Sequence, residues 1–249
     1  YAIVPINLVV PIPDSVTYDQ AAYACLGATA LQAIHRTVPQ LGEYGIVLGQ
    51  GIVGNLASQL SLLSGARTIA WEAMAKRIEI AKQCGIENVV NIREQDNISE
   101  TKQFASPYGA DFAIVAFGGE ATDAFRSAMS CMKVSADGHA MGRIILVGGA
   151  EVNIRGGSGS GNIDIRSSAR TGPGYHDAEY EHGQDYPNAF VPFTTQRNLK
   201  EIIRLIDEGR LKVDPMTTHT IALADVAKAV DLLIDHPDQA MGVVLRMSH

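Results

Sequence analysis

The sequence predicts an α/β fold, a doubly wound parallel sheet of the Rossmann type, from three observations. Short apolar runs alternate with segments of helical periodicity from about residue 44 to residue 152. A glycine-rich turn joins the first apolar run to the helical segment that follows it. The fourth run, residues 110–117, is almost continuously apolar, as expected for a parallel strand that helices cover on both faces.

The glycine-rich turn follows the apolar run 46–48 and has Gly49, Gly51 and Gly54 in the G-x-G-x-x-G spacing. Between a strand and a helix, this spacing is typical of a turn whose backbone approaches a pyrophosphate at the helix N-terminus. The free N–H groups and the helix dipole would hold an anion there without a basic side chain. The spacing alone is a weak signal, because many strand-to-helix turns need glycine for steric reasons.

A second signal supports the dinucleotide interpretation. The apolar run 68–71 ends in Glu72, which follows Gly54 at about the distance of the acid that binds the adenosine ribose hydroxyls in dinucleotide folds. Arg77, one turn into the next helix, could instead meet a 2′-phosphate. Because Glu72 would repel that phosphate, we expect NAD, with NADP as the alternative.

The flanking elements follow from periodicity and from glycine and proline positions. Gly27, inside the first helical segment, implies close packing or a bend, and Gly85 is placed to end the helix before it. The apolar runs and prolines of residues 2–13 favour edge strands and turns, and residues 153–192 read as a long irregular loop with one strand-like piece. The expected helices are 19–35, 74–84, 97–104, a helix through about 132, 194–208 and 224–235; the further strands are 88–90, 142–149, 163–166 and 241–246.

Composition limits the possible partners. The net charge is −7, the pI is about 5.5, and basic residues are scattered, which argues against nucleic acid and an anionic membrane surface. No apolar run approaches the roughly 20 residues that span a bilayer. We expect a cytoplasmic protein in which Cys25, Cys84 and Cys131 are reduced, buried thiols. We also expect no metal site in the chain, because the cysteine and histidine spacings match no metal-binding motif.

Six segments, in this order, resemble the medium-chain dehydrogenase/reductase superfamily of zinc-type alcohol dehydrogenase-like proteins. They are PINLVVPIPDSVTYDQAAYACLGATALQAIHR, IVLGQGIVGNLASQLSLLSGA, WEAMAKRIEIAKQCGIENVVN, GADFAIVAFGGEA, GRIILVGG and HTIALADVAKAVDLLIDHPDQAMGVVL. The resemblance covers essentially the whole chain. It implies an NAD(P)-dependent oxidoreductase that transfers hydride between nicotinamide and a small alcohol or carbonyl substrate, assembled as a homodimer or tetramer.

The resemblance also implies roles for individual residues. Thr29 would pack beside the nicotinamide, and Gly51, Ile52 and Val53 would contact the pyrophosphate. The residues expected to contact the adenosine side of the cofactor are Glu72, Ala73, Arg77, Ala116 and Phe117. Those expected to contact the nicotinamide carboxamide are Val147, Gly148 and Gly149.

Most of the family's N-terminal catalytic domain, which carries the catalytic zinc ligands, has no counterpart in this sequence. The resemblance therefore implies remnants of a GroES-like catalytic domain at residues 1–35, a dinucleotide-binding core at 36–152, and a loop, closing helices and last strands at 153–249. Zinc is expected only in a full-length form, and the catalytic residues stay unknown.

Two alternatives stay open at this point: a zinc-independent, NADPH-dependent quinone-reductase-like enzyme, and a non-catalytic dinucleotide-binding module. The loop RSSARTGPGYHDAEYEHGQDYP further resembles a subset in which such a dehydrogenase is fused to a second oxidoreductase domain. We expect its Tyr175, His176, Asp177 and His182 to be surface residues rather than catalysts.

Overall fold

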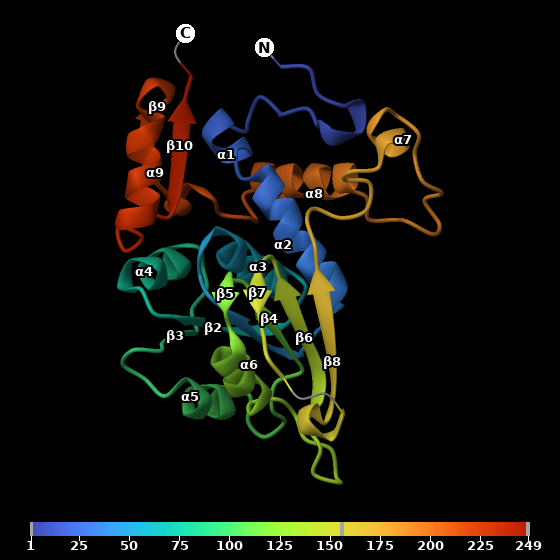
Figure 1. Cartoon of the computed structure of the whole chain (residues 1–249), viewed down its shortest axis with the longest axis vertical. Coiled ribbons are helices and arrows are strands. Elements are labelled where there is room, and N and C mark those ends of the chain that lie inside the picture. The colour runs from blue at the N-terminus through green and yellow to red at the C-terminus, as the bar shows by residue number, and fades with distance from the viewer. Residues whose placement is uncertain (1, 155–156, 248–249) are drawn as a thin grey trace.

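A six-stranded parallel sheet with helices on both faces forms the centre of the molecule in the computed structural model, which describes residues 2–154 and 157–247 (Figure 1). Every strand pair in the sheet is parallel. The predicted doubly wound sheet is confirmed. The strand order is β3 (Val89–Asn91), β2 (Arg67–Glu72), β1 (Tyr44–Leu48), β4 (Phe112–Val115), β6 (Met141–Val147) and β8 (Asn162–Ser168).

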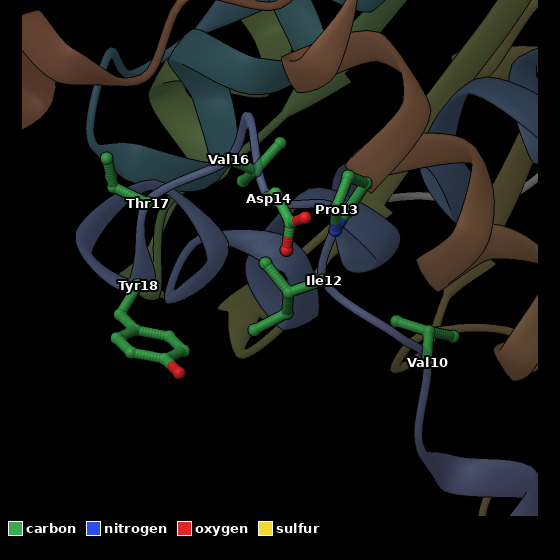
Figure 2. Close-up of a pocket in the computed structure, with 7 residues that line it drawn as sticks. All are labelled: Val10, Ile12, Pro13, Asp14, Val16, Thr17 and Tyr18. Atoms are coloured by element: carbon green, nitrogen blue, oxygen red, sulfur yellow. The ribbon is translucent and has the colours of Figure 1, made fainter.

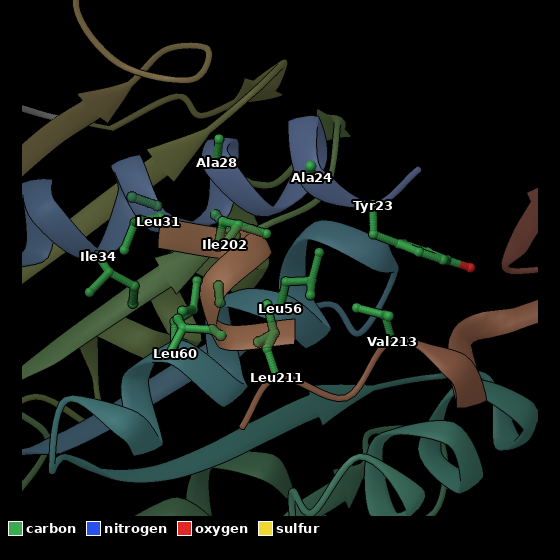
Figure 3. Packing of buried hydrophobic residues seen from close by; sticks show 14 of the residues in the cluster. Tyr23, Ala24, Ala28, Leu31, Ile34, Leu56, Leu60, Ile202, Leu211 and Val213 are labelled. Atoms are coloured by element: carbon green, nitrogen blue, oxygen red, sulfur yellow. The ribbon is translucent and has the colours of Figure 1, made fainter. Parts of the chain in front are cut away.

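One face of the sheet is covered by α2 (Ala24–Thr37) and α3 (Ile52–Leu63), and α8 (Thr195–Asp207) packs against α2. Their buried side chains meet in one core, in which Leu31 of α2, Leu56 of α3 and Ile202 of α8 lie close together (Figure 3). A Cβ on Gly27 would lie 2.6 Å from Cγ2 of Ile202. This close approach of α2 and α8 explains the glycine inside α2, as the sequence predicted.

The opposite face is covered by α5 (Asn97–Phe104) and α6 (Thr122–Met129), with Phe125 fully buried against it. α4 (Ala75–Gln83) packs beside β2 and β3. Gly85 follows α4 with φ of +90°, which confirms the predicted glycine at the end of this helix. Helices on both faces explain why the central strands β1 and β4 are buried along their whole length, without alternation.

Smaller elements surround this core. Within the described residues, β9 and β10 pair in parallel as a separate two-stranded sheet beside α9, and β5 pairs with β7. The bounds of these and the remaining elements are α1 (Tyr18–Ala21), β5 (Gly119–Glu120), β7 (Ala150–Glu151), α7 (Ala178–Glu181), β9 (Thr217–Ala222), α9 (Val226–Asp235), β10 (Gly242–Arg246), and the 3₁₀ turns Ile6–Leu8, Gly157–Ser160, Asp214–Met216 and Leu223–Asp225.

Several expectations were wrong. Residues 2–13 form no strand where the structure describes them, only the short turn Ile6–Leu8, because the prolines leave few backbone N–H groups for pairing. The single helix expected over 19–35 is two helices, α1 and α2, separated at Ala22 and Tyr23. Strand β9 was missed. Cys25 is exposed on α2 rather than buried, whereas Cys84 and Cys131 are buried as expected.

The sheet also continues beyond residue 152, since β8 joins it as an edge strand. Across the parts of the chain that the structure describes, no helix combines the length and apolar character needed to cross a membrane.

Candidate cofactor-binding site

The predicted site residues gather at the carboxyl edge of the sheet. The last residue of β1, Leu48, pairs with Trp71 of β2 and with Val115 of β4. The chain runs outward from β1 to β2 and β3, and then returns to place β4 on the other side of β1. Such a reversal leaves a crevice outside the carboxyl ends of the strands, where ligands of open α/β sheets bind.

Two of the three glycines in the turn are required sterically, and the third borders open space. Gly49 has φ of +85°, a conformation that side chains rarely adopt. A Cβ on Gly54 would lie 1.9 Å from the carbonyl oxygen of Gly49, so α3 can approach the turn only without a side chain there. A Cβ on Gly51 would meet only one neighbour within 4 Å, Nη1 of Arg77 at 3.8 Å, so this side of the turn is open.

The N-terminus of α3 faces this opening. Gly51 is its N-cap residue and no side chain caps the helix, so the first N–H groups, including those of Ile52 and Val53, are left without an intrahelical partner. Arg77 is partly buried on the first turn of α4, and its Nε is buried without a hydrogen-bond partner among the described residues. Free amides, a helix dipole and the nearby Arg77 guanidinium together favour an anion at this point.

Glu72 lies behind the turn and is only 6% exposed. Its Oε2 accepts the N–H of Gln50 at 2.7 Å, and its Oε1 accepts the N–H groups of Ala73 at 2.7 Å and Met74 at 2.9 Å. The carboxylate therefore ties the glycine turn to the loop after β2. Since a carboxylate offers about four acceptor positions, about one is left for a ligand hydroxyl.

Gln50 is a site residue that the sequence reading missed. Its side chain is fully buried, and its Nε2 donates to Gly49 O at 3.0 Å and to Ser58 Oγ at 3.1 Å. These bonds hold the turn against α3. The available signal was a polar residue between two glycines of the motif, followed eight positions later by a serine on the buried side of the helix.

The ends of β4 and β6 complete the edge. A Cβ on Gly49 would lie 3.4 Å from the ring of Phe117 and 3.5 Å from the carbonyl oxygen of Ala116, so both residues border the glycine turn. Gly119 N donates to Gly149 O at 2.9 Å, which joins the loops after β4 and β6. Gly148 and Gly149 are exposed beyond this edge.

Val147 is buried at the end of β6 and pairs in register with Ser168 of β8. Ser168 is 4% exposed, and its Oγ has no hydrogen-bond partner among the described residues. The sequence reading did not select Ser168, because its burial depends on β8 joining the sheet. Thr29 lies on α2, partly exposed, and donates to Cys25 O at 3.2 Å within the helix.

The loop histidines do not join this site. His182 contacts Ala178 O, and the backbone N–H of His176 donates to Glu181 Oε1 at 2.8 Å. Asp177 caps α7 and accepts the Tyr186 hydroxyl, and this hydrogen bond lowers the pKa of the carboxyl. These contacts all lie within the loop and stabilise its conformation.

The described residues do not supply a zinc site. Across residues 2–154 and 157–247, no three His, Cys, Asp or Glu side chains lie together as metal ligands.

A separate hollow of about 650 Å³ lies on the N-terminal segment, around Pro13, Asp14 and Tyr18 (Figure 2). None of the predicted cofactor-binding residues lines it. It is therefore distinct from the carboxyl edge of the sheet.

Comparison with known proteins identifies the family. The family model described as zinc-binding dehydrogenase matches residues 53–180, about half of the chain. This chain belongs to the zinc-binding dehydrogenase family. The resemblance inferred from the six segments is thereby confirmed, and the family is one of alcohol dehydrogenase-like oxidoreductases.

Among curated relatives, an uncharacterised zinc-type alcohol dehydrogenase-like protein of Haemophilus influenzae is 32% identical over 114 residues, 46% of this chain and 33% of the relative. An alcohol dehydrogenase of Cupriavidus necator is 27% identical over 240 residues, 95% of this chain and 58% of the relative. This chain thus spans less than two thirds of the length of these relatives.

Solved structures share the fold. An Escherichia coli oxidoreductase/dehydrogenase of unknown specificity matches with a TM-score of 0.76 at 21% identity, over 96% of this chain and 60% of its own. A short chain alcohol dehydrogenase from Escherichia coli, solved with NADH, matches with a TM-score of 0.72 at 20% identity, over 98% of this chain and 64% of its own.

Proposed function

We propose that this chain binds NAD at the β1–α3 turn and supplies the cofactor-binding part of a medium-chain alcohol dehydrogenase-type oxidoreductase. The open side of Gly51 carries the proposal. The uncapped α3 N-terminus and the Arg77 guanidinium, whose Nη1 would lie 3.8 Å from a Cβ on Gly51, border that opening, and together they fit a diphosphate. The NADH bound to an Escherichia coli structural neighbour agrees with this chemistry.

In this proposal the residues of the chain bind and orient the cofactor. The amides at the start of α3 and the Arg77 guanidinium hold the diphosphate, and Glu72 accepts a ribose hydroxyl at its remaining acceptor position. Ala73, Ala116 and Phe117 border the adenosine side. Thr29 and the backbone of residues 147–149 meet the nicotinamide, which supplies hydride transfer to or from an alcohol or carbonyl substrate when bound.

NADP is the second candidate, and Arg77 is the observation that favours it. A guanidinium with a buried, unpaired Nε could hold a 2′-phosphate. The buried Glu72 carboxylate opposes this, because a second anion beside it would be repelled. We therefore assign NAD.

Titration of the purified chain with NADH and NADPH tests the assignment. Trp71 is the single tryptophan and directly precedes Glu72, so energy transfer from it to bound reduced nicotinamide should report binding. We expect an NADH dissociation constant between about 1 µM and 1 mM, at least about tenfold below that of NADPH, a difference of about 1.4 kcal/mol. Equal or tighter binding of NADPH would contradict NAD, and no saturable binding of either would contradict the function.

The substrate, the zinc and the domain division stay proposals. A small alcohol or carbonyl compound is the proposed substrate, as the name of the Cupriavidus necator relative suggests. A catalytic zinc would need ligands beyond the described residues. We further propose that residues 1–35 and the β9–β10 region belong to a catalytic domain of the GroES-like type.

We also propose that the protein assembles through the edge strand β8. Ile165 is an apolar side chain, 38% exposed, on this edge, and an unpaired strand edge can pair with a second copy. Ile165→Asp is expected to convert a dimer or tetramer to smaller species in light scattering after size exclusion. The matched control Ile92→Asp, beside the opposite edge strand β3, should keep the native mass. A monomeric wild-type chain would contradict the proposal.

A further inference from the structure

The side chain of Gln50 turns back beneath the glycine turn to which it belongs, and it is fully buried. Its Nε2 donates to the carbonyl oxygen of Gly49 at 3.0 Å and to Oγ of Ser58, on the second turn of α3, at 3.1 Å. We propose that Gln50 is the positioning residue for diphosphate binding, because it sets the orientation of the peptide that leads into α3. This inference rests on the proposed cofactor site and adds to it a residue that acts from beneath the turn.

The peptide between Gly49 and Gln50 is held at both of its polar groups. Its carbonyl oxygen accepts Gln50 Nε2, and its N–H donates to Oε2 of Glu72 at 2.7 Å. The N–H of Gly49 donates to Trp71 O at 2.9 Å and so ties the start of the turn to the end of β2. Because a peptide unit is planar, holding its C=O and its N–H fixes its orientation. The chain passes from this peptide through Gly51 into α3, so the held peptide determines where the first N–H groups of the helix point.

The use of a glutamine at this buried position needs a physical reason. A buried amide costs free energy unless its polar groups are hydrogen-bonded, and an apolar side chain would fill the same space without that cost. Gln50 satisfies its amide on the turn and on α3, since its Oε1 also accepts from Ser58 Oγ at 3.3 Å. Ser58 is itself fully buried. The side chain therefore joins the Gly49 carbonyl to the helix whose N-terminus carries the free amides.

A second buried glutamine on α3 offers a matched comparison. Gln59 is 4% exposed, and its Nε2 donates to Asn55 Oδ1 at 2.8 Å and to Lys212 O at 2.9 Å. Its Oε1 accepts the N–H of Lys212 at 2.8 Å. None of these partners belongs to the glycine turn. Loss of either glutamine amide should lower stability, whereas only the loss of the Gln50 amide should change the diphosphate site.

Ligand-detected NMR on the full chain tests the proposal, with ADP-ribose and adenosine as probes. ADP-ribose carries the diphosphate, whereas adenosine has no phosphate and needs only the adenosine side of the site. Gln50→Met keeps the approximate length and volume of the side chain but removes its donor. It should weaken ADP-ribose binding about tenfold and adenosine binding less than about twofold. Adenosine binding should persist because Glu72 keeps the N–H groups of Ala73 and Met74 in the variant.

Two further variants control for stability. Gln59→Met should unfold at a lower urea concentration than the wild type, as Gln50→Met should, yet bind both probes with wild-type affinity. Ser58→Ala is a smaller change that removes one partner of the Gln50 amide, and it should weaken ADP-ribose binding about threefold. It decides the outcome should Gln50→Met not fold.

The results that would overturn the proposal differ from those that would overturn the proposed function. Wild-type ADP-ribose affinity in Gln50→Met, or in Ser58→Ala where Gln50→Met does not fold, would overturn the positioning role alone. Equal weakening of ADP-ribose and adenosine binding in Gln50→Met would do the same, because that pattern indicates general loosening of the fold. No ADP-ribose binding by the wild type would overturn the proposed function, and the positioning role with it.

Discussion

Replacing Gly54 by alanine is expected to destabilise the protein by about 3 kcal/mol, the upper part of the usual range for overpacking, and to weaken NADH binding at least tenfold. The added Cβ would lie 1.9 Å from the Gly49 carbonyl oxygen and 2.9 Å from its carbon. Neither contact can be relieved by rotating a side chain, because both atoms belong to the backbone. Either α3 moves away from β1 or the turn is distorted.

Gly51→Ala is the matched control for this prediction. Its Cβ would find only the end of the flexible Arg77 side chain, 3.8 Å away, and Gly51 already has the ordinary φ of −65°. The free energy of unfolding should therefore change by less than about 0.5 kcal/mol. NADH affinity should nevertheless fall at least tenfold, since the methyl group would occupy the side of the turn proposed for the diphosphate.

Urea unfolding and NADH titration of the two variants separate packing from binding. The expected pattern is that Gly54→Ala loses both properties and Gly51→Ala loses binding alone. Wild-type NADH affinity in Gly51→Ala would show that the diphosphate does not approach this turn. Wild-type stability in Gly54→Ala would show that the close approach of α3 to the turn is unnecessary.

Removing the Glu72 carboxylate should have the second largest effect. Glu72→Ala leaves the backbone N–H groups of Gln50, Ala73 and Met74 without their acceptor. Unsatisfied buried donors cost about 1–3 kcal/mol each, and water entering the vacated space recovers part of that. We expect a loss of about 2–4 kcal/mol in the free energy of unfolding and a fall of at least tenfold in NADH affinity.

Two further variants make this result interpretable. Glu79→Ala, on the outer face of α4, removes an exposed ion pair with Lys76 and an exposed hydrogen bond from Gln83 Nε2, and should be close to neutral. Glu72→Gln keeps one acceptor oxygen and the shape of the side chain, so it should recover much of the stability but less of the NADH affinity. If Glu72→Ala unfolds at the same urea concentration as the wild type, the carboxylate does not hold the turn in solution.

Local features of the fold could be predicted from neighbouring residues. The apolar run at 46–48, the glycines after it and the periodicity of α3 describe one strand–turn–helix unit, and each signal lies within a few residues of the others. Gly85 was correctly expected to end α4 for the same reason. The break between α1 and α2 was not expected, because the apolar periodicity continues through residues 22 and 23.

The sequence could predict which strand ends form the candidate site, but it could not predict the contacts that the site residues make. Glu72 was selected as a ribose acceptor, yet three backbone N–H groups occupy most of its carboxylate. Gln50 and Ser168 were not selected, because their burial depends on α3 and β8 packing against other elements. The proximity of Arg77 to Gly51 likewise follows from how α4 lies beside the turn.

The sequence by itself determined the alternation of strands and helices, the position of the glycine turn and the acid at the end of β2, since backbone preference and hydrophobic periodicity reside in adjacent residues. Only the tertiary structure decided that β8 joins the sheet, that β9 pairs with β10, and that His35 and Asn198 line one cavity. These are contacts between residues far apart in the chain, and their energies depend on packing and burial that no local pattern encodes.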